Sequence, residues 1–108
     1  MDRLNLLLKQ YALRPDDTFV LYAIAMEYEK MAKIQEAIVF FEKIIKINPR
    51  YLPVYYQFAK NLVEINDIGK AKDILDMGVK LAKAQKDIKT VAELNNMLSN
   101  IELEELDY

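Results

Sequence analysis

A spacing of thirty-four residues is the feature that most limits what this chain can fold into. Pro15 and Pro49 are separated by it, and the side chains between them recur by size one period later. The first copy has Leu21, Ile24, Ala25, Tyr28, Ala37 and Phe41, and the second has Tyr55, Phe58, Ala59, Leu62, Ala71 and Leu75. Such a period is typical of arrays whose units stack on one another to bury a shared core. We therefore expect a repeat protein.

The spacing inside each copy predicts helices. Leu21, Ile24 and Tyr28 recur at three and seven residues, which places them on one face of a helix. Ala25 and Ala37 are small where a second helix has to come close to the first. The chain has only two Gly and three Pro, too few for the frequent turns that β-hairpins need. The sequence therefore predicts an all-α fold.

This pattern resembles the tetratricopeptide repeat, whose motif reads W-x2-L-G-x2-Y, then A-x3-F, then P. The residues that match it outright are Tyr28, Ala37, Phe41 and Pro49. In the second copy Leu62 and Leu75 replace aromatic residues, and Lys83 replaces the proline. The resemblance implies a short right-handed α-solenoid of antiparallel helix pairs with about six helices. Lys83 predicts that the last helix of the second repeat continues past the usual stop.

The period divides the chain, which we expect to be a single domain over residues 1–108. The predicted parts are an N-terminal helix over 1–14, a first repeat over 18–51, a second repeat over 52–85 and a C-terminal capping helix over 87–105. One period beyond Tyr55, Ala59 and Leu62 come the polar residues Lys89, Glu93 and Asn96. A terminal helix of a solenoid shows water such a polar outer face. We therefore expect the array to end at this helix.

Two kinds of residue predict where the helices begin and end. Asp17 is a good residue for starting a helix, and Asn66 tolerates the left-handed conformation that often ends one. Asp67, which follows, is expected to cap the next helix. The equivalent turn of the first repeat is Ala32–Lys33, which is a poorer turn signal.

Composition argues against catalysis. The chain has no Cys and no His, which removes the usual thiol nucleophile, general base and metal ligand. Gly69 and Gly78 are isolated, so there is no phosphate-binding loop. The sequence predicts no enzyme, no cofactor and no metal site. A net charge of −2 without a basic patch predicts no nucleic-acid partner, and the lack of a long apolar run predicts no membrane partner and a cytoplasmic protein.

The resemblance also implies a concave groove, lined by the first helix of each repeat, that holds a peptide or protein partner. The groove candidates are Tyr22, Met26, Glu29, Tyr56, Gln57 and Lys60. The alternative for the aromatic residues is that they only pack between helices. Tetratricopeptide domains that grip acidic chaperone tails use a clamp of Lys, Asn and Arg. At the clamp positions of the first repeat this chain has Tyr22 and Met26, and at the second it has Gln57, with Lys60 alone basic nearby. The sequence therefore leaves the partner's identity open.

A second apolar stripe lies on the C-terminal helix. Its members are Val91, Leu94, Leu98 and Ile101, spaced like the seam of a coiled coil. Ile88 and Ala92 are expected to supply the side of the helix that packs back onto the second repeat. Either both sets are buried within the domain, or the stripe is exposed and pairs two copies as a homodimer. The Leu-rich first helix is the other terminal helix through which such self-assembly is expected.

Overall fold

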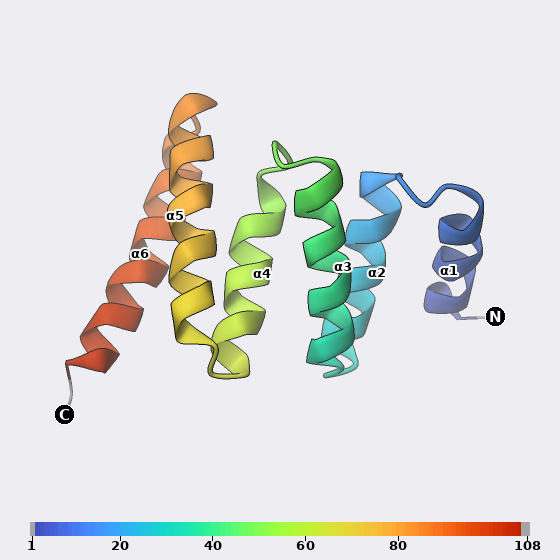
Figure 1. The fold of residues 1–108 in the computed structure, drawn as a ribbon, viewed down its shortest axis with the longest axis horizontal. Helices are drawn as coiled ribbons and strands as arrows, with labels where there is room; N and C mark the ends of the chain where they lie inside the picture. The colour runs from blue at the N-terminus through green and yellow to red at the C-terminus, as the bar shows by residue number, and fades with distance from the viewer. Residues whose placement is uncertain (1, 107–108) are drawn as a thin grey trace. The chain divides into compact units, whose positions relative to one another are not determined.

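The computed structural model describes residues 2–106, and within that range the chain forms six α-helices and no strand. The helices are α1 (Arg3–Leu13), α2 (Thr18–Lys30), α3 (Ile34–Ile47), α4 (Pro53–Glu64), α5 (Ile68–Ala84) and α6 (Ile88–Glu105) (Figure 1). The expected all-α class with about six helices is confirmed. Residue 1 of the expected first helix and residues 107 and 108 of the expected domain lie outside the described residues.

The chain divides into two compact units. Unit 1 spans Met1–Val54 and contains α1, α2 and α3. Unit 2 spans Tyr55–Tyr108 and contains most of α4 together with α5 and α6. The repeat boundaries expected at 18–51 and 52–85 stay predictions.

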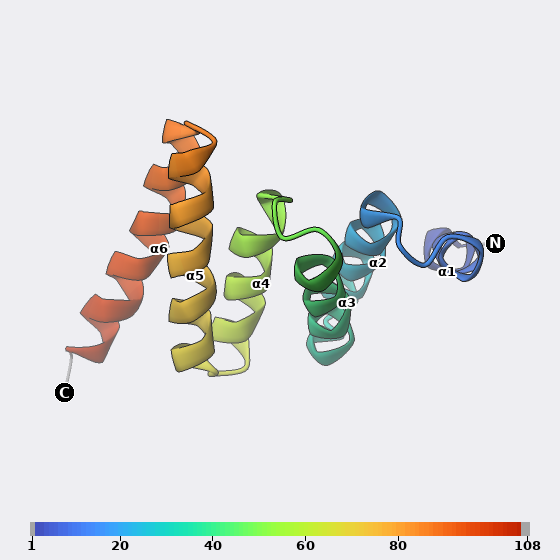
Figure 2. The ribbon, with the colours of Figure 1, turned by 45° about the horizontal axis from the view of Figure 1, so that its top comes forward.

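Unit 1 is organised around the pair formed by α2 and α3, which run antiparallel side by side (Figures 1 and 2). Ala25 and Ala37 have no exposed surface, so the small residues lie where close approach was expected. Leu21, Ile24 and Phe41 are also fully buried. Burying a large apolar side chain contributes about 1.5–3 kcal/mol, so this face supplies most of the unit's stability.

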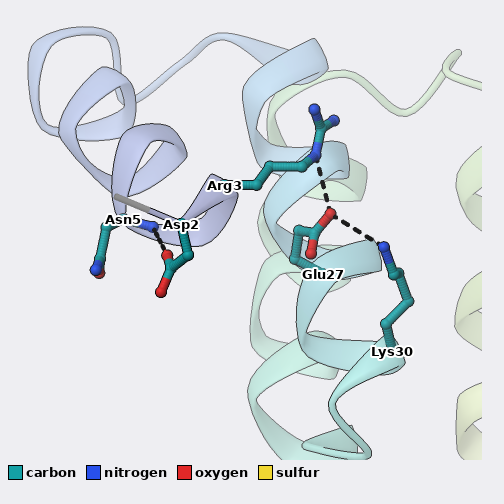
Figure 3. A network of polar contacts seen from close by, with 5 residues as sticks. All are labelled: Asp2, Arg3, Asn5, Glu27 and Lys30. Carbon is teal, nitrogen blue, oxygen red and sulfur yellow. Dashed lines mark hydrogen bonds and ion pairs between the residues drawn. The ribbon is translucent and has the colours of Figure 1, made fainter.

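The first helix packs on α2 and is also joined to it by charge. Asp2 caps α1 by accepting a hydrogen bond of 2.8 Å from the Asn5 backbone N–H. Arg3 Nε lies 2.9 Å from Glu27 Oε1 on α2, and Lys30 Nζ lies 3.6 Å from the same oxygen (Figure 3). The Arg3–Glu27 pair links α1 to α2, whereas the Lys30–Glu27 pair lies within α2. Arg3 and Lys30 are exposed, so each pair contributes at most about 1 kcal/mol.

Unit 2 brings three helices together at Gly78 on α5. A Cβ atom placed on Gly78 would lie 2.8 Å from Tyr55 Cβ on α4 and 3.0 Å from Leu94 Cδ1 on α6. These distances are too short for any residue with a side chain, unless its neighbours shift. Gly78 therefore allows α4 and α6 to approach α5 closely, a role that its isolated place in the sequence does not reveal.

The three tight turns between helices have the same geometry. Ala32, Asn66 and Lys86 all have positive φ angles, of 59°, 62° and 58°. After each of them the next backbone N–H donates to a carbonyl five residues earlier, as Lys33 does to Tyr28 at 2.9 Å. This is the Schellman ending of a helix, which Gly or Asn adopts most easily. Ala32 and Asn66 lie one period apart, so the period extends to the backbone conformation of the turn.

The helix starts agree with the sequence in part. The Asp17 side chain accepts from the backbone N–H groups of Phe19 and Val20, at 3.0 and 3.2 Å, as expected of a cap. Asp67 stands at the capping position of α5, but its side chain makes no capping hydrogen bond, so that prediction is wrong. The Asp67 backbone N–H instead donates to the Leu62 carbonyl at 2.8 Å, and this bond closes the turn without the side chain.

The replacement of proline by Lys83 has the expected consequence. Helix α5 has 17 residues and ends at Ala84, whereas α3 has 14 residues and ends before Pro49.

No helix within residues 2–106 is long and apolar enough to cross a membrane.

Candidate functional site

The six groove candidates divide between the units. Tyr22, Met26 and Glu29 lie on α2 in unit 1, whereas Tyr56, Gln57 and Lys60 lie on α4 in unit 2.

In unit 1, Tyr22 belongs to an aromatic cluster. Its ring meets the Tyr51 ring edge-on, with centroids 5.4 Å apart and planes at 67°, and lies 6.4 Å from the Phe41 ring. Partial burial raises the pKa of the Tyr22 hydroxyl, and the neighbouring Tyr51 and Glu29 raise it further. The Tyr22 ring therefore has two aromatic neighbours within unit 1. Met26 and Glu29, which are half-buried, follow Tyr22 along α2.

In unit 2, Tyr56 borders a pocket instead. The pocket has a volume of about 240 Å³ and is lined by Tyr56 of α4 together with Glu93, Asn96, Met97 and Asn100 of α6. Tyr56 and Met97 are half-buried, while the carboxylate and the two amides are on exposed residues. The lining therefore combines the largely apolar side chains of Tyr56 and Met97 with a row of hydrogen-bonding groups that are open to solvent.

The residues from α6 share one side of that helix. Glu93, Asn96 and Asn100 are spaced three and four residues apart, which aligns them along the helix surface. Each asparagine amide offers a donor and an acceptor, and the carboxylate offers acceptors only. Sequence reasoning assigned Glu93 and Asn96 to a solvent-facing end of the array and did not single out Asn100. The three-and-four spacing of polar residues was the available signal.

The other two unit 2 candidates do not line this pocket. Gln57 is half-buried, and its Oε1 atom has neither solvent contact nor a hydrogen-bond partner. Lys60 is exposed, one turn beyond Tyr56 on α4. Of the sequence candidates, Tyr56 alone is a lining residue here.

The apolar stripe of α6 lies in the core of unit 2. Leu94 is fully buried and Ile101 is 6% exposed, while Val91 and Leu98 are half-buried. The expectation that this stripe could be exposed is therefore wrong for Leu94 and Ile101. Gly78 explains the outcome, because the space above it admits the Leu94 side chain.

The opposite correction applies to Ile88 and Ala92. They were expected to pack back onto the second repeat, but Ile88 is 84% exposed and Ala92 is exposed as well. Helix α6 is thus rotated so that the Leu94 stripe faces inward. The same rotation turns Glu93, Asn96 and Asn100 toward the side on which Tyr56 lies.

Helix α6 is capped at its start by Asp87. The Asp87 carboxylate accepts from the Thr90 backbone N–H at 3.0 Å and from the Thr90 hydroxyl at 2.9 Å. These bonds to Thr90 lower the pKa of Asp87.

Within residues 2–106 there is no group of three or more His, Cys, Asp or Glu side chains that could hold a metal ion.

A family model described as the tetratricopeptide repeat matches residues 30–94, which is more than half of the chain. The chain therefore belongs to the tetratricopeptide repeat family, as its sequence motif implied. The fold of this family is that of a protein–protein interaction module. No curated protein matches the sequence significantly.

Solved structures of such domains are similar to this chain. One is a crystal structure of a tetratricopeptide repeat domain protein from Salinibacter ruber, at 27% identity and a TM-score of 0.75, covering 80% of this chain and 96% of that one. A solution structure of such a protein from the same organism has 26% identity and a TM-score of 0.80, covering 87% and 95%. The TPR2B domain of yeast Sti1, in complex with pHsp70, has 16% identity and a TM-score of 0.86, covering 94% and 81%. At that identity the likeness to Sti1 shows the fold alone.

Proposed function

We propose that the chain is a non-catalytic interaction module that binds an extended peptide segment of a protein partner, with the unit 2 pocket as its main contact. The observation that carries the proposal is the convergence of Tyr56 from α4 with Glu93, Asn96 and Asn100 from α6 around one cavity. The Sti1 domain was solved in complex with pHsp70, which supports a protein segment as the kind of ligand. The proposal includes no cofactor or metal, and a cytoplasmic location stays a prediction from the sequence.

The spacing of the two amides suits an extended chain. Asn96 and Asn100 are four residues apart, a rise of about 6 Å along a helix. Backbone groups that point the same way in an extended peptide recur every second residue, about 7 Å apart. Each amide can donate to a peptide carbonyl and accept from a peptide N–H. The pair therefore matches two backbone positions of a ligand, independently of the ligand's side chains.

Tyr56 and Met97 would supply apolar contact. Tyrosine offers a large, rigid surface with a polar tip, and methionine adapts its shape to different neighbours. Both are half-buried, so they are held in place and still accessible. Tyr22 and Met26 stand where the chaperone-binding relatives place their clamp, and neither can form a charged bond to a ligand carboxylate. We therefore do not extend the pHsp70 ligand itself to this chain.

A peptide array tests the proposal. Randomised ten-residue peptides would be immobilised and probed with the purified protein, and a retained peptide would then be titrated by fluorescence anisotropy. Replacing Asn96 and Asn100 together with Ala should weaken binding of that peptide at least about tenfold, because two hydrogen bonds of about 1 kcal/mol are lost. Asn95→Ala is the matched control, since Asn95 is exposed on the same helix and does not line the pocket. An equal Kd for the double variant and the control would contradict the proposal.

A second candidate function is self-assembly through α6. The contact between copies would involve the exposed Ile88 and not the buried stripe. Ile88 is 84% exposed and borders an apolar hollow of about 440 Å³, which is also lined by Ala82 and Val91. We expect Ile88→Glu to turn any homodimer into a monomer, as measured by size-exclusion chromatography with light scattering. A wild-type protein that remains monomeric at high concentration would rule this candidate out.

A further inference from the structure

The charge of the unit 2 pocket comes from one side chain. Among its five lining residues Glu93 alone carries a carboxyl group, and no lysine or arginine is among them. Two other glutamates do have ion-pair partners, Glu27 in Arg3 and Glu105 in Lys72. Glu93 forms no ion pair within residues 2–106. A carboxylate is therefore available at the rim of a cavity whose other polar groups are neutral.

The nearest cation on the same helix does not change this balance. Lys89 lies one turn before Glu93 and is exposed, but it is not a lining residue and makes no ion pair with Glu93. A lysine four residues before a glutamate is also the weaker order for a helical ion pair. Glu93 is thus the charged side chain among the residues that line the pocket.

Glu93 lies at one end of the row of polar side chains that α6 contributes to the pocket. It precedes Asn96 by three residues and Asn100 by seven, so it lies one helical turn before the first amide and two turns before the second. A peptide whose backbone is bonded by the two amides would pass Glu93 at one end only. A cationic side chain there would reach the carboxylate without leaving the amides unpaired.

We propose that this pocket selects peptide segments carrying a lysine or arginine beside the part held by Asn96 and Asn100. In this proposal the Glu93 carboxylate binds the cationic side chain. The inference rests on the proposed function, since it names the class of peptide that the same pocket takes. The preferred ligand therefore has the opposite charge to the acidic tails that some domains of the family bind. A basic ligand gains a charged hydrogen bond at Glu93, whereas an acidic ligand meets a like charge.

The test compares the residues enriched by four proteins on the randomised peptide array. These are the wild type, Glu93→Gln, Glu93→Lys and, as a matched control, Glu104→Gln. Glu104 is exposed on α6 and does not line the pocket. Glu93→Gln keeps the shape and the hydrogen-bonding capacity of the side chain and removes its charge. Far-ultraviolet circular dichroism of each variant checks that the helices are intact.

The expected result is a set of wild-type peptides rich in Lys and Arg, each bound about five- to tenfold more tightly than its Lys→Gln counterpart. Glu93→Gln should bind both counterparts alike, Glu93→Lys should favour acidic peptides, and Glu104→Gln should behave like the wild type. Raising the salt concentration should reduce the wild-type preference, because the pair is only partly shielded from solvent.

The three ways to fail are distinguishable. If the wild type retains peptides through Asn96 and Asn100 with no preference for basic residues, the charge selection is overturned and the proposed function stands. If the Glu93→Gln variant keeps the full preference for peptides with Lys or Arg, Glu93 does not cause that preference and the inference is again overturned. If the wild type retains no peptide at all, the proposed function fails and this inference fails with it.

Discussion

Two tyrosines in equivalent positions have different surroundings in the two units. Tyr22 on α2 and Tyr56 on α4 are separated by one period of thirty-four residues. The Tyr22 ring contacts Tyr51 and lies near Phe41, while Tyr56 has no aromatic ring contact within the described residues and borders a pocket.

The repeat itself accounts for this difference. One period beyond Phe41 and Tyr51 the chain has Leu75 and Gln85, so unit 2 lacks both of the rings that hold Tyr22. In their absence the tyrosine is left beside the polar residues of α6. The same position within a repeat therefore packs against aromatic rings in one copy and borders a pocket in the next, depending on its neighbours.

The strongest test of this comparison removes the anchor of α6 in unit 2. Leu94→Ala should lower the free energy of unfolding by about 2–5 kcal/mol, because truncating a fully buried leucine leaves a cavity. Leu103→Ala on the same helix should lower it by less than about 1 kcal/mol, since Leu103 is mostly exposed. Urea denaturation followed by circular dichroism measures both. Similar losses in the two variants would mean that α6 does not pack through the Leu94 stripe.

The comparison is tested directly by truncating the two tyrosines. Tyr22→Ala should cost about 2–3 kcal/mol of unfolding free energy, because it removes contacts with Tyr51 and Phe41. Tyr56→Ala should cost less than about 1 kcal/mol and should instead weaken peptide binding, since its partly exposed ring borders an open pocket. Denaturation and anisotropy titrations separate the two effects. A larger stability loss for Tyr56→Ala would reverse the assignment of packing and binding.

The smallest effect is expected at the equivalent turns. Ala32→Gly should stabilise the protein by about 1 kcal/mol, because alanine is strained at the positive φ of this turn and glycine is not. Asn66→Gly should give a smaller gain, since asparagine already tolerates a positive φ. Thermal unfolding of the two variants measures the difference. Ala92→Gly, at an exposed position within α6, is the control and should lose about 1 kcal/mol.

The helices and their contacts could be predicted from the sequence in considerable detail. Ala25 and Ala37 were identified as close-contact positions and are fully buried, and the longer α5 follows from Lys83. The pocket could not be predicted, because its lining depends on how α6 is turned. That helix has two apolar stripes, and either of them could have faced inward.

The sequence by itself thus determined the repeat, the helix pairs and the place of the tyrosines, because local spacing and side-chain size decide which face of a helix can be buried. Only the tertiary structure decided the rotation of α6. Gly78 leaves room for Leu94 against α5, and that contact turns Ile88 outward and brings Glu93, Asn96 and Asn100 beside Tyr56. The choice depends on a close approach of three helices, and no periodicity along one helix carries that information.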